Sequence, residues 1–282
     1  MRPLSSWPVE DRRRVHGVFT DIDDTLTAEG AITPEALAAL GALQAAGLPV
    51  IAVTGRPMGW SEPFARAWPV QAIVAENGAV ALVREQAVLA SSFAGATYSP
   101  ASGHTSGYAI KKLYLQDAVT REGNFARMQE VARRIVAEVP GATLAQDSAG
   151  RETDIAIDHS EFCQLPASAI RQVVATMQAA GMQATVSSIH INGWFGEHDK
   201  LAGARWILRA LTGRDLDDEI ETWAYIGDST NDQCMFERFA QSVGVANIAR
   251  FAPQLTHLPR YITPSERGTG FAEMVQALLA AR

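Results

Sequence analysis

Short apolar segments that alternate with helical patterns constrain the fold of this chain more than any other feature. Helical spacing covers residues 34–46 and 201–211, and Thr33 and Gly47 suit the N-cap and the C-terminal stop of the first helix. Runs rich in Val, Ile and Ala predict buried strands at 15–20, 48–53, 72–75, 222–226 and 242–245. Strands that are apolar throughout, with helices between them, are typical of a parallel sheet covered on both faces. The sequence therefore predicts an α/β fold with a doubly wound, mostly parallel, Rossmann-like core sheet.

The middle of the chain has a different pattern. It predicts strands at 110–115, 154–157 and 182–187, and helices at 124–139 and 166–180. These elements suffice for a compact α+β domain inserted into the first one. The segment 91–107 is rich in Ser, Gly, Ala and Thr and predicts an irregular loop. We therefore predict a core domain made of 1–83 and 189–282, and an inserted cap domain at 84–188.

Composition narrows the possible partners. The net charge of −7 disfavours nucleic acid, because phosphate backbones attract basic surfaces. No apolar run approaches the roughly 20 residues that a membrane span needs, and residues 1–14 contain no signal-peptide core. The two cysteines, Cys163 and Cys234, lie too far apart in the sequence to suggest a metal site or a disulfide framework. We expect a cytoplasmic protein that binds neither membrane nor nucleic acid.

Three of the predicted strands end in clusters of polar residues. The sequence DIDDT begins at Asp21, TGR begins at Thr54, and GDSTND begins at Gly227. Lys200 opens the helix that precedes the last of these strands. Ligands of open parallel sheets bind beyond the carboxyl ends of the strands. We therefore expect the three clusters and the lysine to converge on one crevice.

The residue types in this crevice point to phosphoryl chemistry. Four carboxylates, those of Asp21, Asp23, Asp228 and Asp232, repel one another unless a cation neutralises them. A set of oxygen ligands without nearby His or Cys favours Mg²⁺, which shares its coordination with waters and substrate phosphate. A lysine and a threonine hydroxyl stabilise charge that spreads over phosphoryl oxygens. The sequence predicts a Mg²⁺ site and a small phosphorylated substrate.

The order of these motifs closely resembles that of the haloacid dehalogenase-like phosphatases. Their pattern is DxDxT, a strand-terminal Thr-Gly, a lysine and GDxxND, and here it covers residues 15–83 and 189–282. The insertion resembles the α/β cap of subfamily IIB, which includes many sugar phosphatases. The resemblance implies a phosphomonoester hydrolase that works through an aspartyl-phosphate intermediate.

The resemblance also implies a role for each motif residue. Asp21 attacks phosphorus. Asp23 protonates the leaving oxygen and then deprotonates the hydrolytic water, while its backbone carbonyl binds Mg²⁺. Thr54 and the Gly55 N–H hold the phosphoryl oxygens, and Lys200 neutralises the charge of the nucleophile and the phosphoryl group.

The GDSTND segment supplies the remaining roles. By resemblance, Asp228 is a carboxylate ligand of Mg²⁺ and Asn231 contacts phosphate. Asp232 orients either Lys200 or a metal-bound water. One departure stands out, because the position after the second motif aspartate is often Gly in this family and is Asp24 here.

Several residues outside the motifs are candidates for substrate contact. Asn77 lies in the Glu-Asn-Gly-Ala segment 76–79, which predicts a hairpin turn. His190 and Asn192 share one face of an alternating strand near the end of the insertion, and Arg151 suits bidentate binding of an anionic substituent. For each of these residues an ordinary turn, strand or surface position is an open alternative. Arg56 follows the Thr-Gly motif and suits a place at the edge of the cap.

Short segments of the chain look most like mannosyl-3-phosphoglycerate and sugar-phosphate phosphatases. Two other functions stay open. A phosphosugar mutase uses the same fold, but it needs several cap arginines around its substrate, and most of those in 84–188 fall on helical faces. A non-catalytic metabolite-binding module would not need the complete set of motif residues. The sequence is compatible with a monomer or a homodimer.

Overall fold

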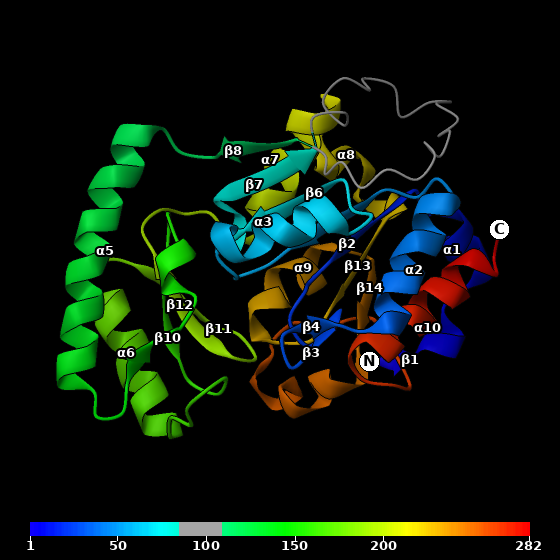
Figure 1. The fold of residues 1–282 in the computed structure, drawn as a ribbon. Helices are drawn as coiled ribbons and strands as arrows, with labels where there is room; N and C mark the ends of the chain where they lie inside the picture. Colours follow the sequence, from blue (N-terminus) through cyan, green and yellow to red (C-terminus); the bar gives the residue numbers. More distant parts are fainter. Residues whose placement is uncertain (85–108) are drawn as a thin grey trace.

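A nine-stranded sheet forms the centre of the protein (Figure 1). The computed structural model describes residues 1–84 and 109–282. The loop predicted at 91–107 lies outside these residues. Strands β1, β15, β14, β13, β2, β5 and β6 run parallel to one another, while β7 and β8 are antiparallel additions at one edge. In spatial order the strands are β1 (Arg2–Pro3), β15 (Tyr261–Ile262), β14 (Gln241–Gly244), β13 (Trp223–Gly227), β2 (Gly17–Thr20), β5 (Val50–Val53), β6 (Ala72–Ala75), β7 (Val80–Arg84) and β8 (Ile110–Tyr114).

Helices cover both faces of this sheet. Val18 of β2 packs into the core on one face and Phe19 into the core on the other, as the two-residue period of a strand requires. The first face carries α1 (Val9–Arg14), α2 (Pro34–Ala45), α3 (Met58–Ala67) and α10 (Arg267–Leu279). The second face carries α7 (Lys200–Thr212), α8 (Leu216–Glu219) and α9 (Gln233–Arg238). The prediction of a doubly wound, mostly parallel sheet is confirmed.

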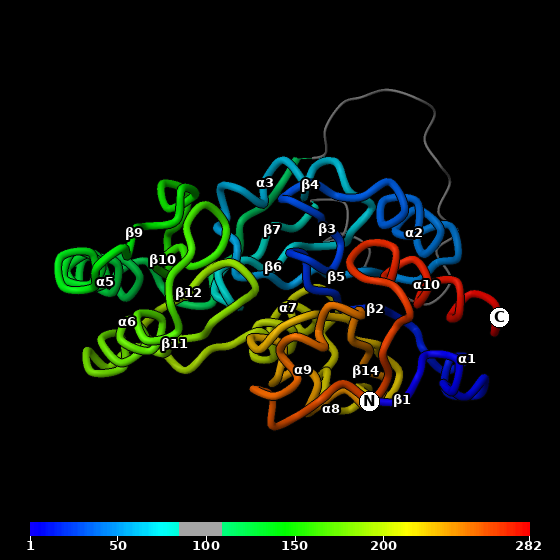
Figure 2. Tube along the Cα trace, turned by 90° about the horizontal axis from the view of Figure 1, so that it is seen from below, coloured from blue at the N-terminus to red at the C-terminus, as the bar shows by residue number. Residues whose placement is uncertain are grey.

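A second, antiparallel sheet lies to one side of the first, as Figures 1 and 2 both show. Its spatial order is β11 (Gln183–Val186), β12 (His190–Trp194), β10 (Ile155–Asp158) and β9 (Thr143–Leu144). Two helices, α5 (Ala118–Glu138) and α6 (Ala167–Ala179), pack on it and close a separate apolar core. A third sheet is the small hairpin of β3 (Thr27–Ala28) and β4 (Ala31–Ile32).

The observed strand pairing does not follow the predicted cap range 84–188 at either end of that range. Strand β8 falls inside 84–188 but pairs with β7 in the large sheet, whereas β12 falls outside that range and pairs with β10 and β11. The sequence of β8, with two exposed lysines, looks like a strand of a small surface domain because it is an edge strand. The domain boundaries themselves stay a prediction.

Helix and turn signals in the sequence are reproduced locally. Thr33 caps α2, since its hydroxyl accepts a hydrogen bond from the Ala36 N–H at 3.1 Å. The predicted turn at 76–79 joins β6 to β7, and positive φ angles occur at Glu76, Asn77 and Gly78. Among the described residues, no helix is long and apolar enough to cross a membrane.

Gly78 is required where this turn meets the start of α7. Its φ is +110°, and a Cβ added there would lie 2.2 Å from the Asp199 carbonyl oxygen. Asp199 caps α7, because its carboxylate accepts from the Ala202 N–H at 2.7 Å, and Lys200 is the next residue. The missing side chain of Gly78 therefore lets the turn and the N-terminus of α7 approach each other closely.

We expect Gly78→Ala to lower the free energy of unfolding by about 3 kcal/mol, because it combines an unfavourable φ with an overlap against backbone. Gly123→Ala is the matched control, since Gly123 lies in α5, is exposed and has no described atom within 4 Å of the added Cβ. That change should stabilise the protein by about 0.5–1 kcal/mol. Urea unfolding measures both, and equal effects of the two variants would contradict the close approach.

Candidate active site

Neighbouring strands bring the polar clusters together. Strands β13, β2 and β5 are adjacent and parallel, so Asp228, Asp21 and Thr54 follow the same end of the sheet. The Asp21 N–H donates to the Ile226 carbonyl at 2.9 Å, which extends the ladder one residue beyond the end of β2. All three polar side chains are buried. The structure thus places at one edge the residues that the sequence predicted to converge.

Lys200 bridges two of the carboxylates. Its Nζ lies 2.5 Å from Asp21 Oδ1 and 2.6 Å from Asp232 Oδ1, and the residue is 1% exposed. Burial works to lower the pKa of Lys200, but the two carboxylates outweigh it and raise the pKa above its ordinary value. The ammonium therefore stays charged in its buried position at the start of α7.

Asp232 has donors on both of its oxygens. Oδ1 accepts from Lys200 Nζ and, at 2.5 Å, from the Tyr225 hydroxyl. Oδ2 accepts from the backbone N–H groups of Asp228 at 2.9 Å and Ser229 at 3.1 Å. A carboxylate with four donors has little capacity left for a metal ion. Of the two roles that the resemblance offers for Asp232, this geometry favours the orientation of Lys200.

Asp21, Asp228 and Asp232 form a buried cluster of carboxylates. An oxygen from each lies within 4.8 Å of the others. Asp228 Oδ2 accepts from Asn247 Nδ2 at 3.1 Å, whereas Oδ1 is buried without a hydrogen-bond partner among the described residues. Burial raises the pKa of Asp21 to about 8 against the effect of Lys200, and burial likewise raises the pKa of Asp228. Asp21 and the unpartnered oxygen of Asp228 could hold a hard cation.

Asp23 is more exposed than the three carboxylates of this cluster. Its carboxylate accepts from Arg56 Nε at 2.8 Å and lies 3.4 Å from Thr54 Oγ1. The next residue, Asp24, has a φ of +54°, a backbone conformation that favours Gly, the residue that the resemblance leads us to expect there. Here Asp24 forms ion pairs with Arg250 and Arg267, each at 3.0 Å, and Arg250 also lies 3.7 Å from Asp228 Oδ2.

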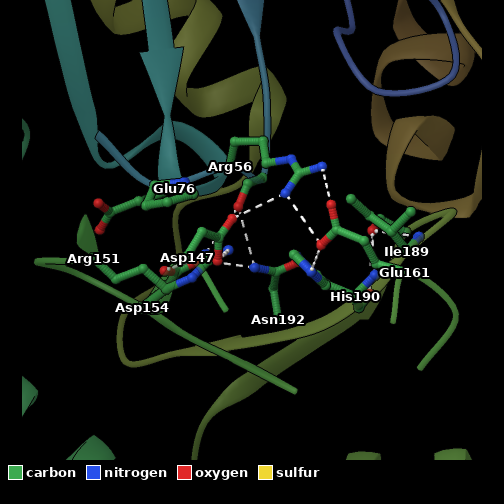
Figure 3. A network of polar contacts seen from close by, with 12 residues as sticks. Arg56, Glu76, Asp147, Arg151, Asp154, Glu161, Ile189, His190 and Asn192 are labelled. Atoms are coloured by element: carbon green, nitrogen blue, oxygen red, sulfur yellow. Dashed lines mark hydrogen bonds and ion pairs between the residues drawn. The ribbon is translucent and has the colours of Figure 1, made fainter. Parts of the chain in front are cut away.

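Arg56 joins the two sheets through an ion-pair network (Figure 3). Beyond Asp23, its guanidinium contacts Glu161 at 2.7 Å and Asp147 at 3.1 Å, and both of these residues belong to the unit of the small sheet. Glu161 also lies 2.8 Å from His190 Nε2. Sequence reasoning missed Glu161 and Asp147, because neither belongs to a motif or to a regular element.

The local sequence explains how Glu161 reaches this network. Asp158 ends β10, and its carboxylate accepts from the N–H groups of Ser160 at 3.0 Å, Glu161 at 2.9 Å and Phe162 at 2.9 Å. Asp side chains stabilise turns in this way. In the β10–β12 ladder Asp158 lies opposite His190, so the turn carries Glu161 back toward that histidine.

The other predicted substrate residues have partners within the protein. Arg151 donates to Asp154 at 2.8 Å, to Asp147 at 3.1 Å and to the Gly55 carbonyl at 3.0 Å. Asn192 donates to Asp154 at 3.0 Å, and Asn77 lies 3.4 Å from the same carboxylate. The Arg151 guanidinium therefore binds protein carboxylates in this structure, and the clamp on an anionic substituent stays a prediction.

A cavity of about 10 Å³ lies between the two sheets. This volume suits about one water molecule. Six of the predicted residues do not line it, although each contacts a residue of the site or its network: Thr54, Asn77, Arg151, Lys200, Asp228 and Asp232. The cavity is lined by Asp21, Asp23, Gly55, Arg56, Ser187, Ser188, Ile189, His190, Asn192, Ser229 and Asn231.

Comparisons with known proteins support the predicted family resemblance. The family model described as haloacid dehalogenase-like hydrolase matches residues 18–102, which confirms the predicted resemblance. A curated relative, the phosphoglycolate phosphatase of Methanothermobacter thermautotrophicus, is 26% identical over 272 residues, which are 94% of this chain and 99% of that protein.

Solved structures share the fold over nearly the whole chain. Thermoplasma acidophilum 0175 has a TM-score of 0.66 at 15% identity and covers 94% of this chain and 98% of its own. The sucrose-phosphatase of Synechocystis sp. PCC6803 has a TM-score of 0.60 at 14% identity, with coverage of 94% and 98%. The subclass IIB sugar phosphatase BT4131 also has a TM-score of 0.60 at 14% identity, with coverage of 95% and 100%.

Asp232→Asn should lower the free energy of unfolding by about 3 kcal/mol. The amide NH₂ would face donors that the carboxylate now accepts from, and buried Lys200 would lose one of its two anionic partners. Asp217→Asn is the control, because Asp217 is 42% exposed and pairs with the surface arginines Arg205 and Arg238, so the loss of its charge should cost less than about 1 kcal/mol. Similar unfolding curves for both variants would show that the bridge does not hold Lys200.

Proposed function

We propose that this haloacid dehalogenase-like hydrolase is a Mg²⁺-dependent phosphatase that cleaves a small phosphorylated metabolite through an aspartyl-phosphate on Asp21. The observation that carries the proposal is the buried Lys200 ammonium between Asp21 and Asp232, beside a carboxylate oxygen of Asp228 without a partner. A buried cation beside a strand-terminal carboxylate suits a nucleophile that must approach a phosphoryl group of like charge.

The donor set fits Mg²⁺. Asp21 and Asp228 offer carboxylate oxygens from adjacent strands, and by resemblance the Asp23 carbonyl completes the protein ligands. Asp232 also belongs to the carboxylate cluster, but we assign it the positioning of Lys200 because both of its oxygens have donors. When bound, Mg²⁺ neutralises charge on the phosphoryl oxygens.

Each step of the proposed reaction is carried out by particular residues of the site. An Asp21 oxygen attacks phosphorus while Asp23 gives a proton to the oxygen of the leaving alcohol, whose bond to phosphorus breaks. Asp23 next takes a proton from water, which attacks phosphorus and releases inorganic phosphate and the Asp21 carboxylate. Thr54, Gly55 and Asn231 hold the phosphoryl oxygens, and Lys200 balances their charge.

Contacts of Asp23 suit this double role. Arg56 contacts one carboxylate oxygen of Asp23 and Thr54 the other, so the carboxyl group is held in place beside the cavity that it lines. Proton transfer of this kind requires an acid held within hydrogen-bond reach of the leaving oxygen. We assign Arg56 as the residue that positions Asp23.

Substrate entry requires movement of the unit that contains the small sheet. A cavity of about 10 Å³ holds about one water and no phosphorylated metabolite. The ion pairs of Arg56 with Glu161 and Asp147 cross the gap between the two units and would break on opening. We propose that this unit is a cap that opens to admit substrate and excludes water when closed.

The substrate is a sugar phosphate or a related phosphorylated metabolite. Hydroxyl, amide and imidazole groups line the cap side of the cavity, and they suit a polar leaving group. Among the cavity-lining residues that the structure describes, Arg56 is the one Lys or Arg side chain. The carboxylates of Asp23, Asp147 and Glu161 already surround its guanidinium. A phosphosugar mutase must bind a second phosphate, so this lining favours hydrolysis over the mutase.

Asp21→Asn should abolish phosphate release from a panel of sugar phosphates, since an amide cannot act as the nucleophile. Asp23→Asn should slow release by roughly 10²–10⁴-fold, the usual contribution of a general acid. Asp217→Asn should leave the rates unchanged. Near-normal turnover by the Asp21 variant would overturn the assignment of the nucleophile.

Removal of metal with EDTA should abolish activity, and added Mg²⁺ should restore it. Titration calorimetry should detect Mg²⁺ binding to the unmodified protein, and Asp228→Asn should weaken this binding at least about tenfold because it removes a carboxylate ligand. Full activity in EDTA would rule out the metal.

A further inference from the structure

Asn247 contacts both loops that supply the proposed metal ligands. It lies in the short 3₁₀-helix Ala246–Arg250 that follows β14, and it is 6% exposed. Its Nδ2 donates to the Asp24 carbonyl at 3.0 Å and to Asp228 Oδ2 at 3.1 Å. Asp24 belongs to the loop after β2 that also carries Asp21, whereas Asp228 follows β13. The NH₂ group has two hydrogens, so this one side chain holds the two loops at a fixed spacing.

The orientation of the Asn247 amide is fixed from its other side. Its Oδ1 accepts from the backbone N–H of Arg267, the first residue of α10, at 3.0 Å. A backbone N–H only donates, so the amide oxygen must face α10 and the NH₂ group must face Asp228. Asn247 is therefore a donor to the Asp228 carboxylate and not an acceptor competing with it.

The two oxygens of Asp228 consequently differ. Oδ2 accepts from Asn247, whereas Oδ1 is buried and has no hydrogen-bond partner in the part of the chain that the structure describes. Arg250 also faces Oδ2, at 3.7 Å, but its side chain is 48% exposed and lies closer to Asp24, at 3.0 Å. Buried carboxylate oxygens normally have a partner, so Oδ1 is the atom left for a cation.

We infer that Asn247 sets the choice of metal ion, because its hydrogen bond leaves Asp228 a single free oxygen with which to bind a cation. This inference rests on the proposed Mg²⁺-dependent activity and concerns the metal site of the same centre. Asn247 does not line the cavity, so it is a positioning residue that acts through Asp228.

The physical reason is that Mg²⁺ and Ca²⁺ require different things of a carboxylate. Mg²⁺ demands octahedral coordination at about 2.0–2.1 Å, whereas Ca²⁺ takes roughly six to eight oxygens at about 2.3–2.6 Å and accepts both oxygens of one carboxylate. A carboxylate that is held by one oxygen and offers the other suits the smaller ion. Without Asn247, Oδ2 would be released, and both oxygens of Asp228 could serve the larger ion.

The test is titration calorimetry of the unmodified full chain and of Asn247→Ala, with Mg²⁺ and Ca²⁺ as probes and without substrate. We expect Asn247→Ala to bind Mg²⁺ about tenfold more weakly, a usual result of removing a residue that orients a metal ligand. Its affinity for Ca²⁺ should stay the same or rise, so the preference for Mg²⁺ over Ca²⁺ should fall about tenfold. An equal loss of affinity for both ions would show general damage to the site and would overturn the inference.

Two further variants keep the test decisive. Asn247→Asp retains an oxygen that can accept from the Arg267 N–H but removes the donor to Asp228, so it replaces Asn247→Ala if that variant does not fold. It should lower the preference for Mg²⁺ as well. In an Asp228→Asn background, Asn247→Ala should no longer change the preference, because the effect passes through the Asp228 carboxylate. A full effect in that background would contradict the inference.

Arg250→Gln is the matched control for charge, since Arg250 faces the same oxygen from a greater distance. Removal of its positive charge should strengthen the binding of both divalent ions alike and leave the preference unchanged. A shift as large as that of Asn247→Ala would show that charge, and not the hydrogen bond, sets the preference.

The outcomes separate this inference from the proposed function. If the unmodified protein binds Mg²⁺ and Asn247→Ala leaves the preference unchanged, the inference is wrong and the proposed function stands. If the unmodified protein does not bind Mg²⁺, the proposed Mg²⁺-dependent function is overturned together with the inference.

Discussion

The ammonium of Lys200 is the interaction on which the site depends. Three carboxylates from two loops lie within 4.8 Å of one another in a buried place, and their mutual repulsion would be prohibitive without compensating charge. Lys200 supplies one charge and is itself held by Asp232, which the Tyr225 hydroxyl and two backbone N–H groups fix in turn. The remaining negative charge leaves room for a divalent cation, which suits the proposed role.

The position of Lys200 depends on how the start of α7 packs in the fold. Asp199 caps α7 so that Lys200 stands at its first turn, and the absence of a side chain at Gly78 lets the β6–β7 turn press against the same point. That turn leads from the core toward the network of Arg56, where Glu76 accepts from the N–H groups of Glu152 and Thr153 in the small-sheet unit. The β6–β7 turn therefore contacts both the start of α7, which carries Lys200, and the unit of the small sheet.

Helices, strands and strand-terminal motifs could be predicted from the sequence, whereas contacts that depend on which strands pair could not. Apolar runs and the Thr33 cap predicted β2, β5 and α2, and strand-terminal motifs predicted which carboxylates would converge, because parallel strands end at one edge. The pairing of β8 with β7 in the large sheet could not be predicted, since nothing in the sequence of β8 indicates which strand it pairs with. Glu161 was missed for the same reason: the register of β10 with β12 brings it to His190, and no motif marks it.

The central claim is that Asp21 carries a phosphoryl group during turnover. The most direct measurement is acid quenching of the Mg²⁺-loaded protein within a single turnover of a good substrate, followed by mass spectrometry of its peptides. The account predicts one phosphoryl group on the peptide that contains Asp21, absent from Asp21→Asn and from protein quenched without Mg²⁺. Rapid phosphate release with no phosphorylated peptide, or with the phosphoryl group on another residue, would contradict it.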